Sequence, residues 1–187
     1  MKKLTICIDM DDTIEYLLPA WLEWIANQHH FKVKPEAIKS WDITEYFPHL
    51  TVDQICYPLS IPEFWDTVKP MKDAIEIIPR LINKGHKVYI CTSTNYKNAK
   101  EKFDRCLFKY FPFIDKHNII TCYRKQMVKC DILIDDAIHN LVEGDYIGIL
   151  ITSFCNTDID ISNYPNIYRC DNWYKIEEFI DNFTNAG

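Results

Sequence analysis

The fold is decided by residues 4–13, Leu-Thr-Ile-Cys-Ile-Asp-Met-Asp-Asp-Thr, where an apolar run meets three acidic residues. Leu4–Ile8 is apolar and contains several β-branched residues, which is typical of a buried strand. Asp9, Asp11 and Asp12 follow at its carboxyl end, the place where open parallel sheets bind their ligands. Because like charges packed this closely repel one another, the cluster indicates either a solvated acidic turn or a site for a divalent cation such as Mg²⁺.

Similar apolar runs recur along the chain and alternate with segments of helical periodicity. The runs predict further strands at residues 87–91, 118–121, 132–134, 147–151 and 167–169. The helical spacing predicts helices over residues 73–83, 95–110 and 174–183. Alternation of this kind is typical of a parallel sheet with crossover helices. We therefore expect an α/β fold with a doubly wound, mostly parallel, Rossmann-like sheet.

A long stretch interrupts this pattern. About sixty residues separate the first strand from the helix that begins at Asp73, whereas the usual crossover is much shorter. Helical patches within the stretch are predicted at residues 17–29 and 52–59. We expect a small, mostly helical cap, residues 16–70, inserted after the first strand into a core domain made of residues 1–15 and 71–187.

The predicted cap is rich in aromatic residues. Trp21 and Trp24 lie three residues apart in a helical stretch, so packing in the core explains them without a ligand. Trp41, Phe64 and Trp65 lie in irregular, proline-flanked sequence, where stacking on a planar ligand is the alternative to core packing. The sequence leaves both interpretations open for these three rings.

Composition limits the possible functions. With 187 residues, 48% of them hydrophobic, the chain is expected to fold around one core. The formal net charge is −6 and no dense basic run is present, which disfavours nucleic-acid binding. The four glycines, at positions 85, 144, 148 and 187, cannot make either of the common glycine-rich phosphate-binding motifs.

Cysteine spacing and the N-terminal sequence indicate the compartment. The eight cysteines lie at least eight positions apart, so none forms a C-x-x-C metal or redox pair. The N-terminal stretch reaches Asp9 too early for a signal peptide, and no apolar stretch approaches the roughly 20 residues of a membrane span. We expect a cytoplasmic protein with reduced, buried thiols and no membrane partner.

Three further predicted strands lead into groups that suit a phosphate and a cation. The second strand ends in Thr92-Ser93, whose hydroxyls can hydrogen-bond phosphate oxygens. Lys125 follows the third and can offset phosphate charge. The fourth ends in Asp135-Asp136, which adds carboxylates for a cation. Each alone is an ordinary strand-end, surface or turn residue, but four such strand ends in this order favour one common site.

This ordered set resembles the four motifs of the haloacid dehalogenase-like superfamily of phosphohydrolases. The motifs are DMDDT, ICTS, RK and IDD in this chain, and the resemblance covers about residues 4–13 and 73–151. Within the superfamily the chain is most similar to the 5′(3′)-deoxyribonucleotidases, through IDMD, ICTS and the DILIDD run that follows Lys125.

The resemblance implies a role for each acidic residue. Asp9 would be the nucleophile that forms an aspartyl-phosphate, and it would also bind Mg²⁺. Asp11 would be the general acid and then the general base, with its backbone carbonyl on the metal. Asp136 would complete the metal ligands, and Asp135 would support them. Asp12 stands where related enzymes often have glycine, so its side chain is expected to point away from the phosphate.

The resemblance also implies which groups bind the substrate. Thr92, Ser93 and Lys125 would hold the phosphate oxygens. In the cap the resemblance reaches only Ser40-Trp41 and Phe64-Trp65, so the three aromatic rings of these pairs are the candidates for stacking on a base. The loop after Ser93, which reads TNYK, departs from the Ser-Pro that is usual in the family.

The expected protein is thus a Mg²⁺-dependent phosphomonoesterase that dephosphorylates (deoxy)ribonucleoside monophosphates, as a 5′(3′)-deoxyribonucleotidase. A phosphatase of sugar phosphates or of another small phosphomonoester is the alternative within the same fold. A phospho-acceptor signalling receiver is a more distant alternative, because it uses similar groups. A receiver places its lysine last, however, whereas Lys125 here precedes the second acidic pair.

Overall fold

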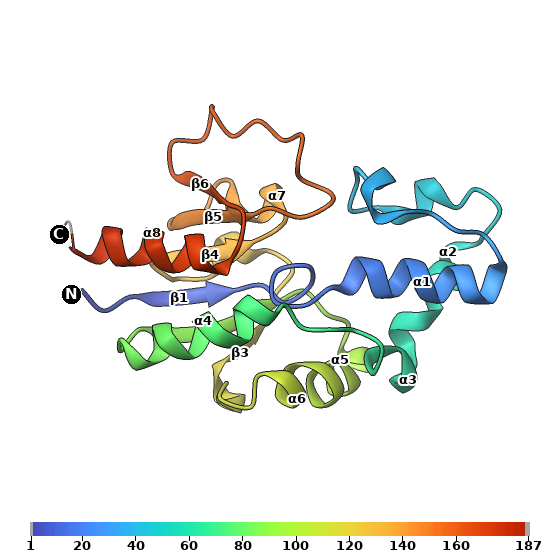
Figure 1. Ribbon diagram of the computed structural model, residues 1–187, viewed down its shortest axis with the longest axis horizontal. Helices are drawn as coiled ribbons and strands as arrows, with labels where there is room; N and C mark the ends of the chain where they lie inside the picture. The colour runs from blue at the N-terminus through green and yellow to red at the C-terminus, as the bar shows by residue number, and fades with distance from the viewer. Residues whose placement is uncertain (1, 186–187) are drawn as a thin grey trace.

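A computed structural model describes residues 2–185, and its centre is a sheet of six strands in the order β3-β2-β1-β4-β5-β6 (Figure 1). Every neighbouring pair of strands is parallel. The strands are β1 (Thr5–Ile8), β2 (Lys87–Thr92), β3 (Ile119–Thr121), β4 (Ile132–Asp135), β5 (Ile147–Ile151) and β6 (Ile167–Cys170). The predicted α/β class is confirmed, and no strand end differs from its predicted position by more than one residue.

The order of the strands explains where a site can form. The chain runs outward from β1 through β2 to β3, and then returns to the other side of β1 with β4. Such a reversal leaves a crevice at the carboxyl ends of the two central strands, because the connections leave toward opposite sides. Asp9 follows β1 directly and Asp135 ends β4, so the acidic residues of both strands meet at this crevice.

Both faces of the sheet are covered, as the continuous apolar runs require. On one face, alternate strand residues such as Ile6, Ile90 and Ile134 pack against α4 (Lys72–Asn83) and α8 (Trp173–Asn185). On the other face, the intervening residues form a smaller cluster with α7 (Ile138–Leu141). Because successive side chains of a strand point to opposite faces, each apolar strand contributes residues to both cores.

The segment between β2 and β3 is less regular than the single predicted helix over residues 95–110. It begins as α5 (Tyr96–Lys102), with the Asn95 side chain accepting a hydrogen bond from the Lys97 N–H as its cap. A π-helical turn, Phe103–Leu107, follows, and α6 (Phe108–Tyr110) completes the segment. Wider turns of this type often occur at functional sites, and this one directly follows Lys102.

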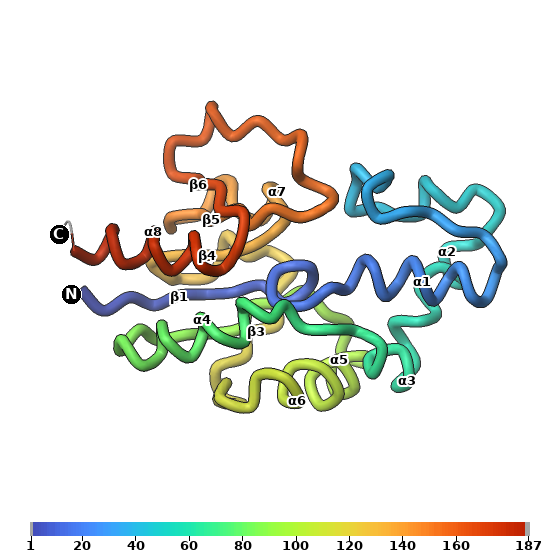
Figure 2. Tube along the Cα trace, in the orientation of Figure 1, coloured from blue at the N-terminus to red at the C-terminus, as the bar shows by residue number. Residues whose placement is uncertain are grey.

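The inserted stretch is helical, as predicted, and lies at one end of the sheet (Figure 2). Its elements are α1 (Leu17–His29), η1 (Pro35–Ala37), η2 (Ile43–Tyr46), α2 (Val52–Cys56), η3 (Tyr57–Ser60) and α3 (Pro62–Trp65). The two ends of the stretch meet, because the Tyr16 N–H donates to the Lys69 carbonyl and the Met71 N–H to the Ile14 carbonyl, both at 2.8 Å. This closure supports our proposal that residues 16–70 form a cap inserted into the core domain.

The structure describes the state of the cysteines and the character of the helices. All eight cysteines are free thiols, and five of them are buried: Cys7, Cys91, Cys106, Cys130 and Cys170. Within residues 2–185, none of the helices has the length and apolar character that a membrane crossing requires.

Candidate active site

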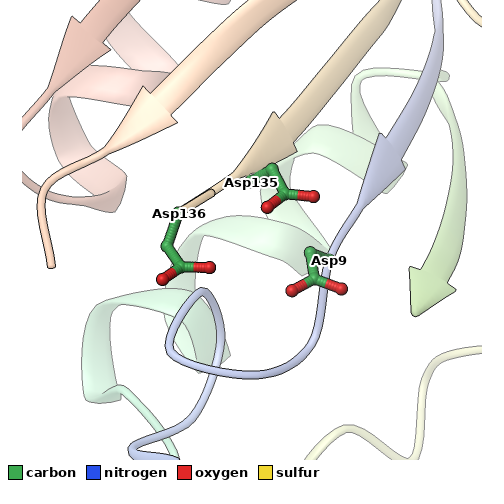
Figure 3. A group of neighbouring side chains, drawn as sticks. All are labelled: Asp9, Asp135 and Asp136. Carbon is green, nitrogen blue, oxygen red and sulfur yellow. The ribbon is translucent and has the colours of Figure 1, made fainter. Parts of the chain in front are cut away.

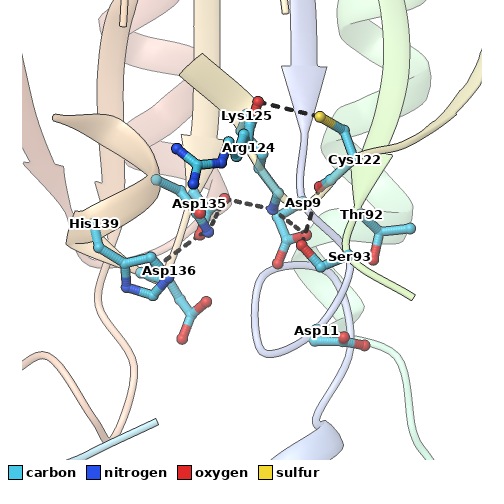
Figure 4. A network of polar contacts seen from close by, with 12 residues as sticks. Asp9, Asp11, Thr92, Ser93, Cys122, Arg124, Lys125, Asp135, Asp136 and His139 are labelled. Carbon is cyan, nitrogen blue, oxygen red and sulfur yellow. Dashed lines mark hydrogen bonds and ion pairs between the residues drawn. The ribbon is translucent and has the colours of Figure 1, made fainter. Parts of the chain in front are cut away.

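The loop after β1 holds the first two acidic residues in different surroundings. The Asp9 N–H donates to the Ile134 carbonyl at 2.8 Å, which fixes the buried Asp9 beside β4. Two residues later, Asp11 points toward Thr92, on the opposite side of Asp9 from Asp136 (Figure 4). Asp12 has a left-handed backbone (φ 49°), a conformation that glycine adopts more readily. Its carboxylate accepts a hydrogen bond from the Leu18 N–H at 3.1 Å, at the first turn of α1.

Lys125 lies between two of the carboxylates. It begins the short turn η6 (Lys125–Met127), its side chain is buried, and its Nζ lies 2.5 Å from Asp9 Oδ1 and 2.6 Å from Asp135 Oδ2. Burial raises the pKa of Asp9 to about 7 even though Lys125 acts in the opposite direction. Burial by itself lowers the pKa of Lys125, but the two carboxylates outweigh it and the net shift is upward. The lysine therefore stays charged and offsets the buried acids.

The two aspartates that follow β4 differ in what their oxygens contact. Both oxygens of Asp135 are engaged: Oδ1 by the Ala137 N–H at 2.8 Å, Oδ2 by Lys125, and each by the Asn140 amide at 3.1 Å. Among residues 2–185, Asp136 accepts hydrogen bonds at Oδ2 only, from Trp41 Nε1 at 3.1 Å and Ser153 Oγ at 3.2 Å. Burial, and then the charge of Asp135, raise the pKa of Asp136 well above its usual value.

This arrangement fits a divalent cation. One carboxylate oxygen from each of Asp9, Asp135 and Asp136 lies within 4.8 Å of the others (Figure 3), and an all-oxygen set suits Mg²⁺. Because both oxygens of Asp135 are already engaged, the oxygens of this set without a partner among residues 2–185 are the second oxygens of Asp9 and Asp136. The Asp11 carboxylate is outside this group.

The two hydroxyl residues that end β2 have different positions. Ser93 lies at the cavity wall, and its Oγ donates to the Cys122 carbonyl at 3.0 Å. Thr92 is buried behind the wall, and its Oγ1 accepts a hydrogen bond from Lys102 Nζ at 3.0 Å. Ser93, Lys125 and Asp9 therefore share one cavity surface, and Thr92 supports it from behind.

A cavity of about 480 Å³ opens above the carboxylates, between the sheet edge and the cap. This volume is in the range of sites for small organic ligands. The sheet side supplies the charged groups, whereas the cap side supplies apolar ones: Leu17, Leu18, Trp21, Trp41 and Ile43. The cavity therefore combines a charged floor with an apolar roof.

The structure places the three candidate stacking rings differently. Trp41 lines the cavity and makes a T-shaped contact with the His139 ring at a centroid distance of 5.5 Å. Phe64 and Trp65 are 0% and 2% exposed and belong to the main core, where they contact each other at 5.2 Å. As placed, neither ring offers a face to a ligand. The expectation that Phe64 and Trp65 stack on a base is therefore wrong, because apolar burial at the cap–core junction uses both of them.

Several residues at the site were not expected from the sequence. Trp21, assigned to the core, lines the cavity while its Nε1 donates to the Ile55 carbonyl at 2.6 Å. His139 and Tyr123 also line the cavity, and Lys102 forms an ion pair with Asp11. His139 could have been suggested by its place three residues after Asp136. No local sequence pattern marks Trp21, Tyr123 or Lys102 as residues of the site.

Comparisons with known proteins show which family the chain is similar to. A family profile described as "5' nucleotidase, deoxy (Pyrimidine), cytosolic type C protein" matches residues 2–185. A 5′(3′)-deoxyribonucleotidase from Clostridium acetobutylicum is 35% identical over 188 residues, covering 99% of each chain. One from Bacillus subtilis is 29% identical, covering 95% of this chain and 98% of its own. A haloacid dehalogenase-like hydrolase from Streptococcus pneumoniae superposes with a TM-score of 0.66 at 12% identity, covering 95% of this chain and 98% of its own.

The parallel sheet and the acid, hydroxyl, lysine and acid groups at its carboxyl edge define a haloacid dehalogenase-like phosphohydrolase, an enzyme that acts on phosphoric monoesters. Within that superfamily, the chain belongs to the 5′(3′)-deoxyribonucleotidase family. The resemblance predicted from the motifs is confirmed, and the signalling-receiver alternative is excluded.

Proposed function

We propose that this enzyme dephosphorylates deoxyribonucleoside monophosphates in a Mg²⁺-dependent reaction that passes through an aspartyl-phosphate on Asp9. The observation that carries the proposal is the position of the Asp9 carboxylate. It is held 2.5 Å from the buried Lys125 ammonium, it lies within 4.8 Å of the other acids, and it faces a cavity large enough for a nucleotide.

In the first half-reaction, an oxygen of Asp9 attacks the phosphorus atom of the substrate. A bond forms between that oxygen and phosphorus while the ester bond to the nucleoside breaks. The departing nucleoside oxygen takes a proton from Asp11, which acts as general acid. Asp11 suits this role because its side chain is 29% exposed, whereas that of Asp9 is 8% exposed. The products of this step are a free nucleoside and the aspartyl-phosphate.

In the second half-reaction, water attacks the phosphorus atom and Asp11 accepts a proton from it. The bond between phosphorus and Asp9 breaks, which releases inorganic phosphate and restores the carboxylate. During both steps Lys125 holds a phosphate oxygen, and Ser93 joins it when its hydroxyl turns from the Cys122 carbonyl to the substrate. Thr92, which accepts from Lys102, supports this wall of the cavity from behind. The positive charge of Lys125 also reduces the repulsion between Asp9 and a dianionic substrate.

Asp9 and Asp136 would hold the Mg²⁺ ion together with the backbone carbonyl of Asp11, and Asp135 would keep Lys125 in place beside them. When bound, the ion would supply positive charge to the phosphate and to the crowded carboxylates. The fit of the cation rests on the second carboxylate oxygens of Asp9 and Asp136. Their first oxygens are already bound by Lys125 and by Trp41 and Ser153, respectively.

The substrate class rests on the cap side of the cavity and on the relatives. The matched family is described by deoxypyrimidine nucleotides, and the relatives are named 5′(3′)-deoxyribonucleotidases. A planar base placed on the Trp41 ring would gain roughly 1–3 kcal/mol, by analogy with single-strand binding, whereas a sugar would gain much less. We therefore propose that dUMP and dTMP are better substrates than sugar phosphates.

The test is a panel of phosphomonoesters assayed with Mg²⁺ and with excess chelator. We expect kcat/KM to be higher for dUMP and dTMP than for glucose 6-phosphate and glycerol phosphate, and we expect chelator to abolish every activity. Equal turnover of nucleotides and sugar phosphates would favour the sugar-phosphatase alternative. Full activity in excess chelator would contradict the Mg²⁺ requirement.

A further inference from the structure

Lys102, the last residue of α5, is buried against the candidate general acid. Its side chain is 2% exposed, and its Nζ lies 2.6 Å from Oδ1 and 2.7 Å from Oδ2 of Asp11. The same Nζ donates to Thr92 Oγ1 at 3.0 Å. One ammonium group therefore connects both oxygens of Asp11 with the hydroxyl at the end of β2.

The ammonium group does not reach the substrate space. The residues around the cavity include Asp9, Asp11, Ser93 and Lys125, whereas Lys102 lies behind Asp11. On its other side the ammonium faces the buried ring of Trp65, 5.7 Å from the ring centroid. Any effect of Lys102 on the reaction must therefore pass through Asp11 or Thr92.

A buried lysine is costly unless its partners compensate for the loss of water. Here the compensation is local, because Glu15 is also buried in this cluster, with neither carboxyl oxygen hydrogen-bonded within the described part of the chain. Burial by itself lowers the pKa of Lys102, but Asp11 and Glu15 outweigh it, so the net shift is upward. The Lys102 ammonium thus offsets the charge of this buried cluster, and it has almost no contact with water because its side chain is 2% exposed.

Lys102 is the charged partner of the Asp11 side chain within residues 2–185. The Asp11 side chain is 29% exposed at the cavity wall, and the structure gives it no ion pair other than the one with Lys102 among residues 2–185. A general acid is efficient only when its oxygen stands within hydrogen-bond reach of the leaving oxygen, and a misplacement of about 1 Å can cost about a hundredfold in rate.

We propose that Lys102 is a positioning residue: its ion pair with the Asp11 carboxylate holds the general acid toward the leaving group of the substrate, and its hydrogen bond to the Thr92 hydroxyl keeps the ammonium itself in place. The inference rests on the proposed function, in which Asp11 protonates the departing nucleoside. It adds a residue of α5, outside the four strand-end motifs, to the groups on which the reaction depends.

The test compares two leaving groups in the variant Lys102→Met, which keeps an unbranched side chain one atom shorter and removes the charge. A nucleoside alcohol needs a proton to depart, whereas para-nitrophenolate does not. We expect kcat/KM for dUMP to fall by roughly tenfold to a hundredfold, a part of what general acid catalysis contributes. We expect para-nitrophenyl phosphate to lose much less, and KM for dUMP to change little.

The matched control is Lys100→Met, on the same helix. Lys100 is exposed and pairs with Asp104 at 3.1 Å, so its replacement should leave both rates unchanged. Combining Lys102→Met with Asp11→Asn should cost no more than Asp11→Asn alone, because the lysine acts through that carboxylate. The ratio of the two kcat/KM values is measured within one preparation, so a smaller folded fraction does not alter it.

An equal fall on both substrates, or a further fall in the Asp11→Asn background, would overturn the positioning role and leave a structural one. If Lys102→Met does not fold, Lys102→Gln provides the same comparison with a neutral donor in place, and the same ratio decides. Absence of phosphatase activity in the wild-type protein would instead overturn the proposed function, so the two failures are distinguishable.

Discussion

The indole nitrogen of Trp41, in the cap, donates a hydrogen bond of 3.1 Å to Oδ2 of Asp136, at the end of β4. The ring therefore has a fixed position: its N–H is bonded to the acidic floor, and the ring makes a T-shaped contact with His139 at a centroid distance of 5.5 Å. An aromatic ring with a fixed orientation is a better stacking surface than a free one, because less conformational entropy is lost on binding.

The Trp41 ring should accordingly be tested for substrate binding. We expect Trp41→Ala to raise KM for dUMP by about tenfold, the effect of losing roughly 1–3 kcal/mol of stacking. Hydrolysis of para-nitrophenyl phosphate should change less, since Ser93 and Lys125 still hold the phosphate. Trp41→Phe keeps a ring without the N–H and should have an intermediate KM. Steady-state kinetics on both substrates check this, and equal losses on both would count against stacking.

Trp65 should respond differently, because it is part of the core. Its Nε1 donates to the Leu59 carbonyl at 3.2 Å and its ring is 2% exposed. Truncating a buried tryptophan typically costs about 3–5 kcal/mol, so Trp65→Ala should lower the denaturation midpoint strongly. The KM of the remaining folded protein for dUMP should stay unchanged. A stable Trp65→Ala variant with a raised KM would restore the stacking role.

Replacing the nucleophile should abolish turnover without unfolding the protein. We expect Asp9→Asn to lower kcat by about three orders of magnitude or more, because the amide cannot form the phosphoenzyme. Acid-quenched samples should then contain no phosphorylated protein, whereas the wild type should show it. Asp145→Asn, at an exposed carboxylate, serves as the control. Retention of a labelled phosphoenzyme in Asp9→Asn would place the nucleophile elsewhere.

Metal binding should weaken in acid. The pKa of Asp9 is raised to about 7, chiefly by burial. Below that pH a proton occupies the carboxylate and competes with the cation, whereas above it the ligand is ionised. The affinity for Mg²⁺ should therefore fall as the pH drops through 7 and reach a plateau above about 8. Titration calorimetry between pH 5.5 and 8.5 measures this directly, and an affinity independent of pH would exclude Asp9 as a ligand.

The strands and their chemistry were predictable because each signal is local. The run from Leu4 to Ile8 can be buried on both faces only as a central parallel strand, and the residue after such a strand is bound to face the crevice. The location of Asp9, Ser93 and Asp136 at the crevice could therefore be predicted from their sequence positions alone. The signals for the helix over residues 73–83 were equally local: its apolar residues have helical spacing, and Gly85, which has a positive φ, follows its end.

The fate of the aromatic rings and of Lys102 depended on packing between distant segments. Trp41 and Trp65 have similar irregular, proline-flanked surroundings in sequence, yet one lines the cavity and the other fills the core. Nothing local distinguishes Lys102 from the exposed Lys100, because the partner that buries it, Asp11, lies 91 positions away along the chain. By itself the sequence determined the strands and the polar groups at their ends. Only the tertiary structure decided which side chains surround those groups, because burial of a ring or a charge is a property of the segments that meet there.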